Sequence, residues 1–160
     1  MIRYRFLSLI LFVAPAAAQV GLSRADQAAA FKAAGFRQHG TQWQACGDPG
    51  TASYTPGKIE TVRDLNGDGR LEAVITEGSI ACFGGAEMGY TIVSKQVDQS
   101  WKRITEGTGI PTILATRGAG GWPDIEVGGQ GFCFPVERWN GKAYVLQRHQ
   151  YEGKPCRPAR

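Results

Sequence analysis

The residues best spaced for chemistry are the oxygen-bearing side chains of residues 64–72. Counted from Asp64, oxygen side chains stand at positions 1, 3, 5 and 9, and a glycine stands at position 6. Alternate spacing directs Asp64, Asn66 and Asp68 toward one centre, as Ca²⁺ requires of a loop that wraps round it with oxygen ligands. Position 12, which carries the bidentate acid of an EF-hand, is Ile75. The loop is predicted to bind Ca²⁺; the alternative is a plain tight turn, which Asn, Asp and Gly also favour.

This spacing resembles the calcium loop of FG-GAP/VCBS repeats, in which D-x-[DN]-x-[DN]-G-x-x-D joins two strands of a hairpin in integrin-like β-propeller blades. The resemblance implies a structural Ca²⁺ ion whose ligands are Asp64, Asn66, Asp68, the carbonyl of Arg70, and Glu72. Glu72 stands where the family usually has Asp. Only one such loop is present, and a propeller of several blades needs far more chain than 160 residues. The resemblance therefore covers only the loop and its flanking strands.

Four aromatic side chains form a second candidate site. Trp122, Phe132, Phe134 and Trp139 fall close together in the sequence. An exposed aromatic patch would bind a sugar ring or a peptide. The alternative is that these side chains pack in the core or on a hairpin face.

Acidic residues are weaker candidates, in this case for a catalytic site. Asp124 and Glu126, with Glu77 or Glu87, would supply the carboxylate pair of a glycosidase if they faced one another across a cleft. Asp124 and Glu126 alternate with apolar residues, which instead predicts a solvated strand face. The two histidines have no matched Ser or Cys nucleophile. We therefore expect a protein without catalytic activity.

The N-terminus has the pattern of a secretory signal peptide. Arg3 and Arg5 precede a short apolar run, and small residues at 16–18 fit a signal-peptidase site. The apolar run is too short to span a bilayer, which takes about 20 residues. Residues 1–18 are therefore predicted to be a signal peptide, and residues 19–160 a single periplasmic or secreted domain without a membrane span.

The cysteines agree with export. The chain has four, Cys46, Cys82, Cys133 and Cys156, and none is arranged as Cys-x-x-Cys. An even number of cysteines in an exported chain predicts disulfides, here two, with three connectivities open. Zinc and thioredoxin-like redox sites are poorly supported, because each needs clustered ligands or a paired motif.

The charge argues against a nucleic-acid partner. The chain has 18 Lys and Arg against 14 Asp and Glu; without Arg3 and Arg5 the balance is 16 against 14, a net charge of +2. The remaining basic residues are scattered, apart from the tail at 154–160. Nucleic-acid binding usually shows a concentrated basic patch.

The elements that must position these residues are mostly strands. Ser23 and Asp26 form a capping-box pattern ahead of an Ala-rich helix at 25–34. Beyond it, β-branched and aromatic clusters between glycines predict short strands with tight turns. The expected strands are 42–45, 59–63, 71–76, 90–95, 101–105, 113–116, 124–127, 132–139 and 142–148. The fold class is mostly β, built of β-meander sheets, with one N-terminal helix and two disulfides.

A weak internal sequence repeat divides the expected strands into two meanders. In each, an apolar strand precedes a glycine-rich stretch containing Cys-Phe, and two further strands follow. Equivalent positions for Cys82 and Cys133 predict a bridge between them. Cys46 would then pair with Cys156.

Together these features predict a periplasmic or secreted, calcium-stabilised binding or interaction module, with a protein or glycan of the cell envelope as partner. The alternatives are a hydrolase of envelope polymers that uses carboxylates, and a hydrolase inhibitor with a protruding loop at 117–123. The glycine-rich segments at 107–111, 120–129 and 131–135 are similar to those of small exported proteins of alphaproteobacteria of the Sphingomonas type. That similarity implies export and carries no activity.

Overall fold

The N-terminal helix begins where the capping pattern predicts. The computed structural model describes residues 21–158, so the predicted signal peptide lies outside the described residues. Helix α1 spans Arg24–Ala33, and the Ser23 hydroxyl accepts a hydrogen bond of 3.1 Å from the Asp26 N–H. Capping of this kind satisfies one of the free N–H groups of the first turn.

Strands make up most of the rest of the chain, in three antiparallel sheets. The small sheet consists of β1 (Arg37–His39) and β2 (Gln42–Gln44). The first large sheet has the order β3 (Thr55–Arg63), β4 (Glu72–Gly78), β5 (Met88–Lys95) and β6 (Trp101–Thr108). The second follows β7 (Ile110–Arg117), β8 (Pro123–Gly128), β9 (Phe134–Trp139), β10 (Tyr144–Tyr151) and β11 (Lys154–Pro155). Short helical turns lie at α2 (Ile80–Phe83), η1 (Gly84–Ala86) and η2 (Ala119–Gly121).

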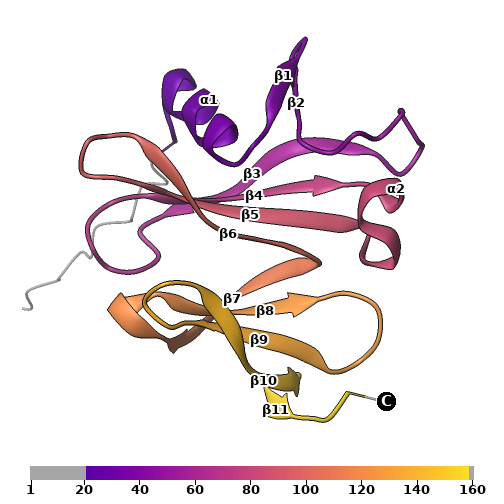
Figure 1. The fold of residues 1–160 in the computed structure, drawn as a ribbon, viewed down its shortest axis with the longest axis vertical. Helices are drawn as coiled ribbons and strands as arrows, with labels where there is room; N and C mark the ends of the chain where they lie inside the picture. Colours follow the sequence, from indigo (N-terminus) through magenta and orange to yellow (C-terminus); the bar gives the residue numbers. More distant parts are fainter. Residues whose placement is uncertain (1–20, 159–160) are drawn as a thin grey trace, which may run out of the picture.

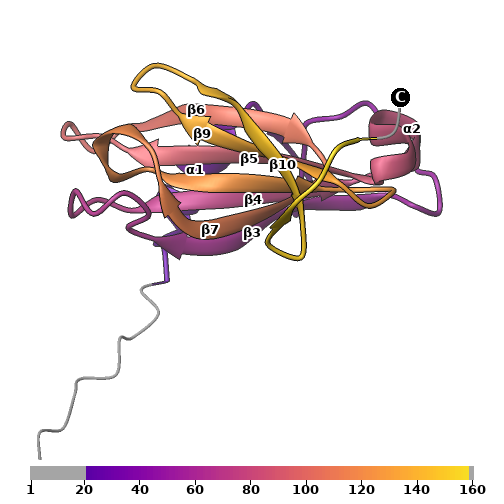
Figure 2. The same ribbon diagram turned by 90° about the horizontal axis from the view of Figure 1, so that it is seen from below.

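Both large sheets are meanders in sequence order, which confirms the predicted β-meander fold class. They stack as two layers, and α1 with the β1–β2 hairpin forms a third layer on the far side of the first sheet (Figure 1). The view from below shows the second sheet lying over the first, with β8 nearly along the strands beneath it and β10 crossing them at an angle (Figure 2). The molecule is thus a helix-and-hairpin layer on a two-sheet sandwich.

Each face of the first sheet has its own core. On the helix side, Phe31 and Phe36 pack against Ile75 and Val93 of the sheet. Between the sheets, Ile92 packs with partners from both layers, namely Leu65, Val74, Tyr90, Trp122 and Ile125. Burial of large apolar side chains in two clusters supplies the main stabilising free energy and fixes the order of the layers.

The disulfide pairing differs from the prediction. Cys46 is bonded to Cys82, and Cys133 to Cys156, with Cα separations of 6.2 and 5.8 Å. The predicted bridges between the meanders are therefore wrong, although two disulfides are present. Equivalent positions in the two meanders lie on different sheets, and each cysteine finds a nearer partner. Cys82 in α2 meets the chain leaving β2, and Cys133 meets the chain that follows β11.

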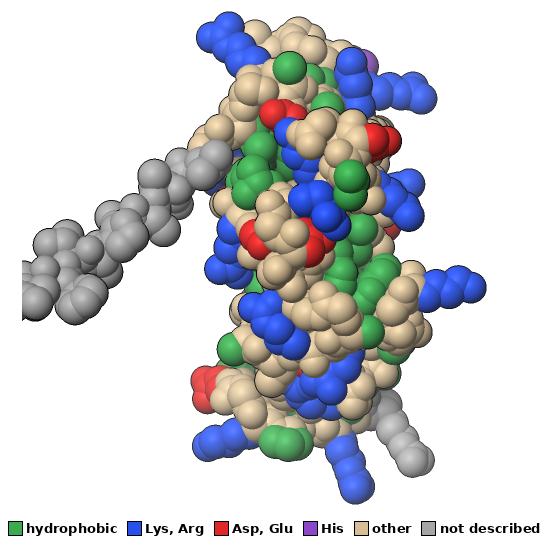
Figure 3. All heavy atoms as spheres, turned by 90° about the vertical axis from the view of Figure 1, so that its left-hand side faces the viewer, with side chains coloured by type: hydrophobic (Ala, Val, Ile, Leu, Met, Phe, Trp, Pro, Cys, Tyr) green, Lys and Arg blue, Asp and Glu red, His purple; other side chains and the backbone are tan. Residues whose placement is uncertain are grey.

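Among residues 21–158, no helix has the length and apolar character needed to cross a membrane. Figure 3 shows the face on the left of Figure 1, where Lys and Arg side chains are spread over the full height of the molecule instead of gathering in one patch.

Candidate functional site

The predicted calcium loop is the connection between two paired strands. Arg63, the last residue of β3, pairs with Glu72, the first residue of β4. The loop thus closes an antiparallel hairpin at one end of the first sheet, as the FG-GAP/VCBS resemblance implies. Gly67 and Gly69 both have φ of +83°, a conformation that costs other residues energy.

Asp64 organises the loop through its carboxylate. It accepts hydrogen bonds from the N–H groups of Gly67 (2.7 Å), Gly69 (2.8 Å) and Asp68 (3.2 Å). Burial raises the pKa of the Asp64 carboxyl, but these N–H donors lower it by more, and the net shift is downward. Asp64 is therefore ionised in any neutral solution, and the backbone curls around its negative charge.

Asn66 and Asp68 face the same loop. The Asn66 side chain donates to Asp68 Oδ2 (3.1 Å) and accepts from the Asp68 N–H (3.0 Å). Asp68 also forms an ion pair with the Arg70 guanidinium, which in turn donates to the Lys95 carbonyl (3.1 Å). Arg70 thus offsets part of the negative charge of the loop.

Glu72 is the most deeply buried acid of the loop. Its side chain is 0% exposed, and its carboxylate accepts from the Leu65 N–H and from the Ser94 hydroxyl, both at 2.7 Å. Burial raises the pKa of Glu72, and the nearby charges of Asp68 and Asp64 act in the same direction. No Lys, Arg or His side chain within residues 21–158 forms an ion pair with Glu72.

One observation favours a bound cation in the loop of residues 64–72, and one argues against it. The loop carries three carboxylates, and the buried one, Glu72, forms no ion pair within residues 21–158, an arrangement that a divalent cation would relieve. Against this, no group of three or more His, Cys, Asp or Glu side chains within the described part of the chain is placed to hold a metal ion. Two of the expected ligands, the Asn66 amide and the Arg70 carbonyl, are outside those residue types.

The second sheet holds the loop in place. Arg117, at the end of β7, donates to the Leu65 carbonyl and to the Gly121 carbonyl (2.7 Å). A side chain at Gly121 would come within 3.0 Å of the Asn66 carbonyl, so the β7–β8 connection lies directly against the loop. Within residues 117–123, Trp122 (8% exposed) and Pro123 are buried, while Arg117, Ala119 and Gly120 are exposed.

The four aromatic side chains do not gather at one place. Trp122 and Trp139 lie together between the sheets, with ring centroids 5.7 Å apart and Tyr144 beside them. Phe132 and Phe134 instead contact Tyr151, with centroid distances of 5.4 and 6.1 Å. Phe132 is 74% exposed, so only this second pair offers a surface.

Asp124 is buried, where the alternation of the sequence predicts a solvated strand face. It is 0% exposed and accepts two hydrogen bonds from Arg138 (2.8 and 2.9 Å), one from Thr116 (2.6 Å) and one from Arg148 (3.1 Å). The hydrogen bonds from Arg138 are the largest cause of the low pKa of Asp124, which lies well below its usual range. Burial acts in the opposite direction. A general acid in a glycosidase needs the opposite shift. Asp124 is therefore an ion-pair centre of the second sheet.

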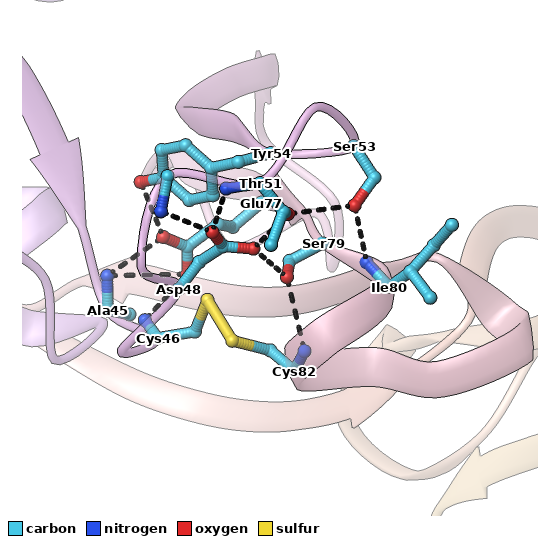
Figure 4. The surroundings of a disulfide bond; sticks show 11 residues. Ala45, Cys46, Asp48, Thr51, Ser53, Tyr54, Glu77, Ser79, Ile80 and Cys82 are labelled. Carbon is cyan, nitrogen blue, oxygen red and sulfur yellow. Dashed lines mark hydrogen bonds between the residues drawn. A yellow bond between two sulfur atoms is a disulfide. The ribbon is translucent and has the colours of Figure 1, made fainter.

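Glu77 also lies deep, on the helix side of the first sheet. It is 2% exposed and accepts from the N–H groups of Ala45 (3.1 Å) and Cys46 (2.9 Å) and from the Tyr54 hydroxyl (3.0 Å). Figure 4 shows it pointing toward these donors beside the Cys46–Cys82 disulfide. Burial, followed by the bond to Glu77, raises the pKa of Tyr54 to about 12. The donors lie 23–32 residues away in the chain, so no local sequence signal marks this site.

The structure separates the acidic side chains that the hydrolase alternative would need to bring together. Asp124 belongs to the second sheet and Glu77 faces the helix layer of the first. The Glu126 carboxylate accepts a hydrogen bond from the side-chain amide of Gln150 (2.6 Å). Glu87 lies in an exposed turn with φ of +59°. Asp124 and Glu77 therefore do not face one another across a cleft.

Comparison of the chain with protein-family models, with curated proteins and with solved structures finds no match.

Proposed function

We propose that the protein is a calcium-stabilised binding module that works outside the cytoplasm, without catalytic activity. The observation that carries the proposal is the hairpin loop of residues 64–72, in which Asp64 accepts hydrogen bonds from three backbone N–H groups while Glu72 lies buried with no ion pair to any Lys, Arg or His of residues 21–158. The two disulfides support the location, because such bonds persist in oxidising compartments.

In this proposal the side chains of Asp64, Asn66, Asp68 and Glu72 and the Arg70 carbonyl hold the ion. Ca²⁺ supplies positive charge at a loop that fastens the first sheet to the second through Arg117. The role is structural: the ion orders a hairpin and neutralises carboxylates. Affinity in the range of extracellular modules, about 10⁻⁴–10⁻³ M, suits this role.

The test is thermal unfolding of the mature, oxidised protein in millimolar Ca²⁺ and in excess chelator. A ligand that binds only the folded state, at about 10–100 times its Kd, adds about 1.4–2.7 kcal/mol. For a domain of this size the increment is about 4–10 °C in Tm. The variant Asp64→Ala/Asp68→Ala should lose the increment.

Asp98→Ala is the matched control, because Asp98 also caps an exposed turn, with its carboxylate accepting from the Ser100 N–H (3.0 Å). It should keep the calcium increment. If Ca²⁺ leaves the Tm of the wild-type protein unchanged, residues 64–72 are a turn stabilised by Asp64, and the calcium part of the proposal is wrong.

A further inference from the structure

A cleft of about 290 Å³ opens on the helix side of the first sheet, away from the calcium loop. Its walls come from Phe36, which follows α1, and from Phe83 in α2. Two acids, Glu77 on β4 and Glu106 on β6, line it together with Thr91 between them. The volume is near the lower limit of small-molecule sites, so the cleft suits a compact ligand.

Gly89 on β5 leaves part of the cleft wall without a side chain. Gly89 pairs with Glu77 on one side and with Thr108 on the other, so the middle of this row has no side chain. A Cβ at Gly89 would lie within 3.0 Å of the Phe83 ring, which shows that the ring rests on the bare backbone. An aromatic wall therefore stands directly beside the Glu77 carboxylate.

The cleft has more negative than positive charge. Glu77 is 2% exposed and has only neutral hydrogen-bond donors, since no Lys, Arg or His of residues 21–158 forms an ion pair with it. Glu106 pairs with Arg103, and both side chains are largely exposed, at 61% and 46%. A cation entering the cleft would find one buried carboxylate without a charged partner.

We propose that this cleft binds a primary ammonium group on a short alkyl stem. The ammonium lies toward Glu77 and Glu106, and the stem packs against Phe36 and Phe83. Aromatic faces attract cations as well as apolar stems, so both halves of the ligand are favoured. Either a free alkylamine or a lysine side chain of a peptide has this chemistry. The inference gives the proposed binding module a ligand and does not depend on calcium.

The test is amide NMR of the full mature chain titrated with n-butylammonium chloride, with n-butanol as the uncharged match. We expect saturable shifts at the amides of Ala45, Cys46, Gly89 and Gly107, with a Kd on the order of 1 mM for so small a ligand. Butanol should bind at least several-fold more weakly. Absence of saturable shifts at these amides would overturn the proposal.

Glu106→Gln is the decisive variant, because this exposed side chain can change without affecting the fold. It should weaken butylammonium binding about threefold to fivefold, in line with the loss of one exposed charge interaction. Glu152→Gln, an exposed acid in the turn between β10 and β11, should leave binding unchanged. Equal binding by the two variants contradicts the proposal.

A second titration distinguishes the sources of the ammonium. Nα-acetyl-lysine methylamide binding more tightly than butylammonium supports a peptide lysine, and weaker binding supports a free amine. Since this experiment measures amine binding and the calcium test measures thermal stability, the two proposals fail separately.

Discussion

Single residues determine how charge is held inside this small domain, and Asp124 is the clearest case. It is completely buried, yet both of its arginine partners stay about one-third exposed, at 35% and 30%. The pair therefore retains part of its solvation while the carboxylate keeps every hydrogen bond. We expect Asp124→Asn to cost about 3 kcal/mol of unfolding free energy, because it removes one partner of a buried pair.

The loss should depend on pH. The pKa of Asp124 lies below its unfolded value because of the bonds from Arg138. The carboxylate therefore contributes its full stabilisation above the unfolded pKa, and loses it as the pH falls toward the native value. Urea unfolding at pH 7 and pH 3 should show a smaller difference between wild type and variant at pH 3. Glu126→Gln is the control, because Glu126 lies on the same strand and pairs with no arginine of residues 21–158. A pH-independent difference between wild type and Asp124→Asn would contradict this account.

Residue types alone single out the loop of residues 64–72 as a candidate cation site, but they do not single out the surroundings of Asp124 or Glu77. The loop is local, with all its side-chain oxygens within nine positions, so spacing is sufficient to mark it as a candidate. Asp124 alternates with Ile125 and Val127, and this pattern predicts a solvated face. Arg138 and Arg148 cover it from strands 14 and 24 residues later, a consequence of register that composition does not show.

At the scale of elements, periodicity and turn residues predict most strands, because each large sheet pairs neighbours in sequence order. The elements that sequence analysis missed are short: β1 has three residues and β11 has two. Strands of this length carry too few residues for a periodic signal. The β9–β10 turn shows the same limit. Trp139 pairs with Tyr144, so four residues connect β9 and β10, whereas the expected strands 132–139 and 142–148 leave only two.

The disulfides belong to this scale, because each joins neighbouring elements. Peptide mapping of the oxidised protein should give a Cys46–Cys82 fragment and a Cys133–Cys156 fragment, and a Cys82–Cys133 fragment would contradict the structure. Cys133→Ala/Cys156→Ala should lower the unfolding free energy by about 3 kcal/mol, as expected for a loop of 23 residues. Urea unfolding under oxidising conditions measures the loss. The same titration with reductant added is the control, because both proteins then lack disulfides and the difference should disappear.

At the scale of the whole molecule, the two sheets meet at more than their shared core. The loop of residues 64–72, the proposed calcium site, belongs to the first sheet, and the turn that follows β7 belongs to the second. Arg117 bonds to a carbonyl of each, Leu65 and Gly121. Ordering of one connection therefore supports the other, which links the proposed calcium ion to the stability of the complete sandwich.

Substitutions at two adjacent glycines can test the contact between the β7–β8 connection and the loop of residues 64–72. Gly120 and Gly121 both have positive φ, +59° and +77°, so alanine is strained at either. Only at Gly121 would the new Cβ lie within 3.0 Å of the Asn66 carbonyl; at Gly120 the nearest atom is 3.8 Å away. Gly121→Ala should therefore cost about 1–3 kcal/mol more than Gly120→Ala in urea unfolding, the usual penalty for overpacking. It should also shift the amides of residues 64–72, which Gly120→Ala should leave in place. If the two variants are equally stable, the two connections do not press on each other at Gly121, and the close contact adds nothing to the join that the apolar core and Arg117 make between the sheets.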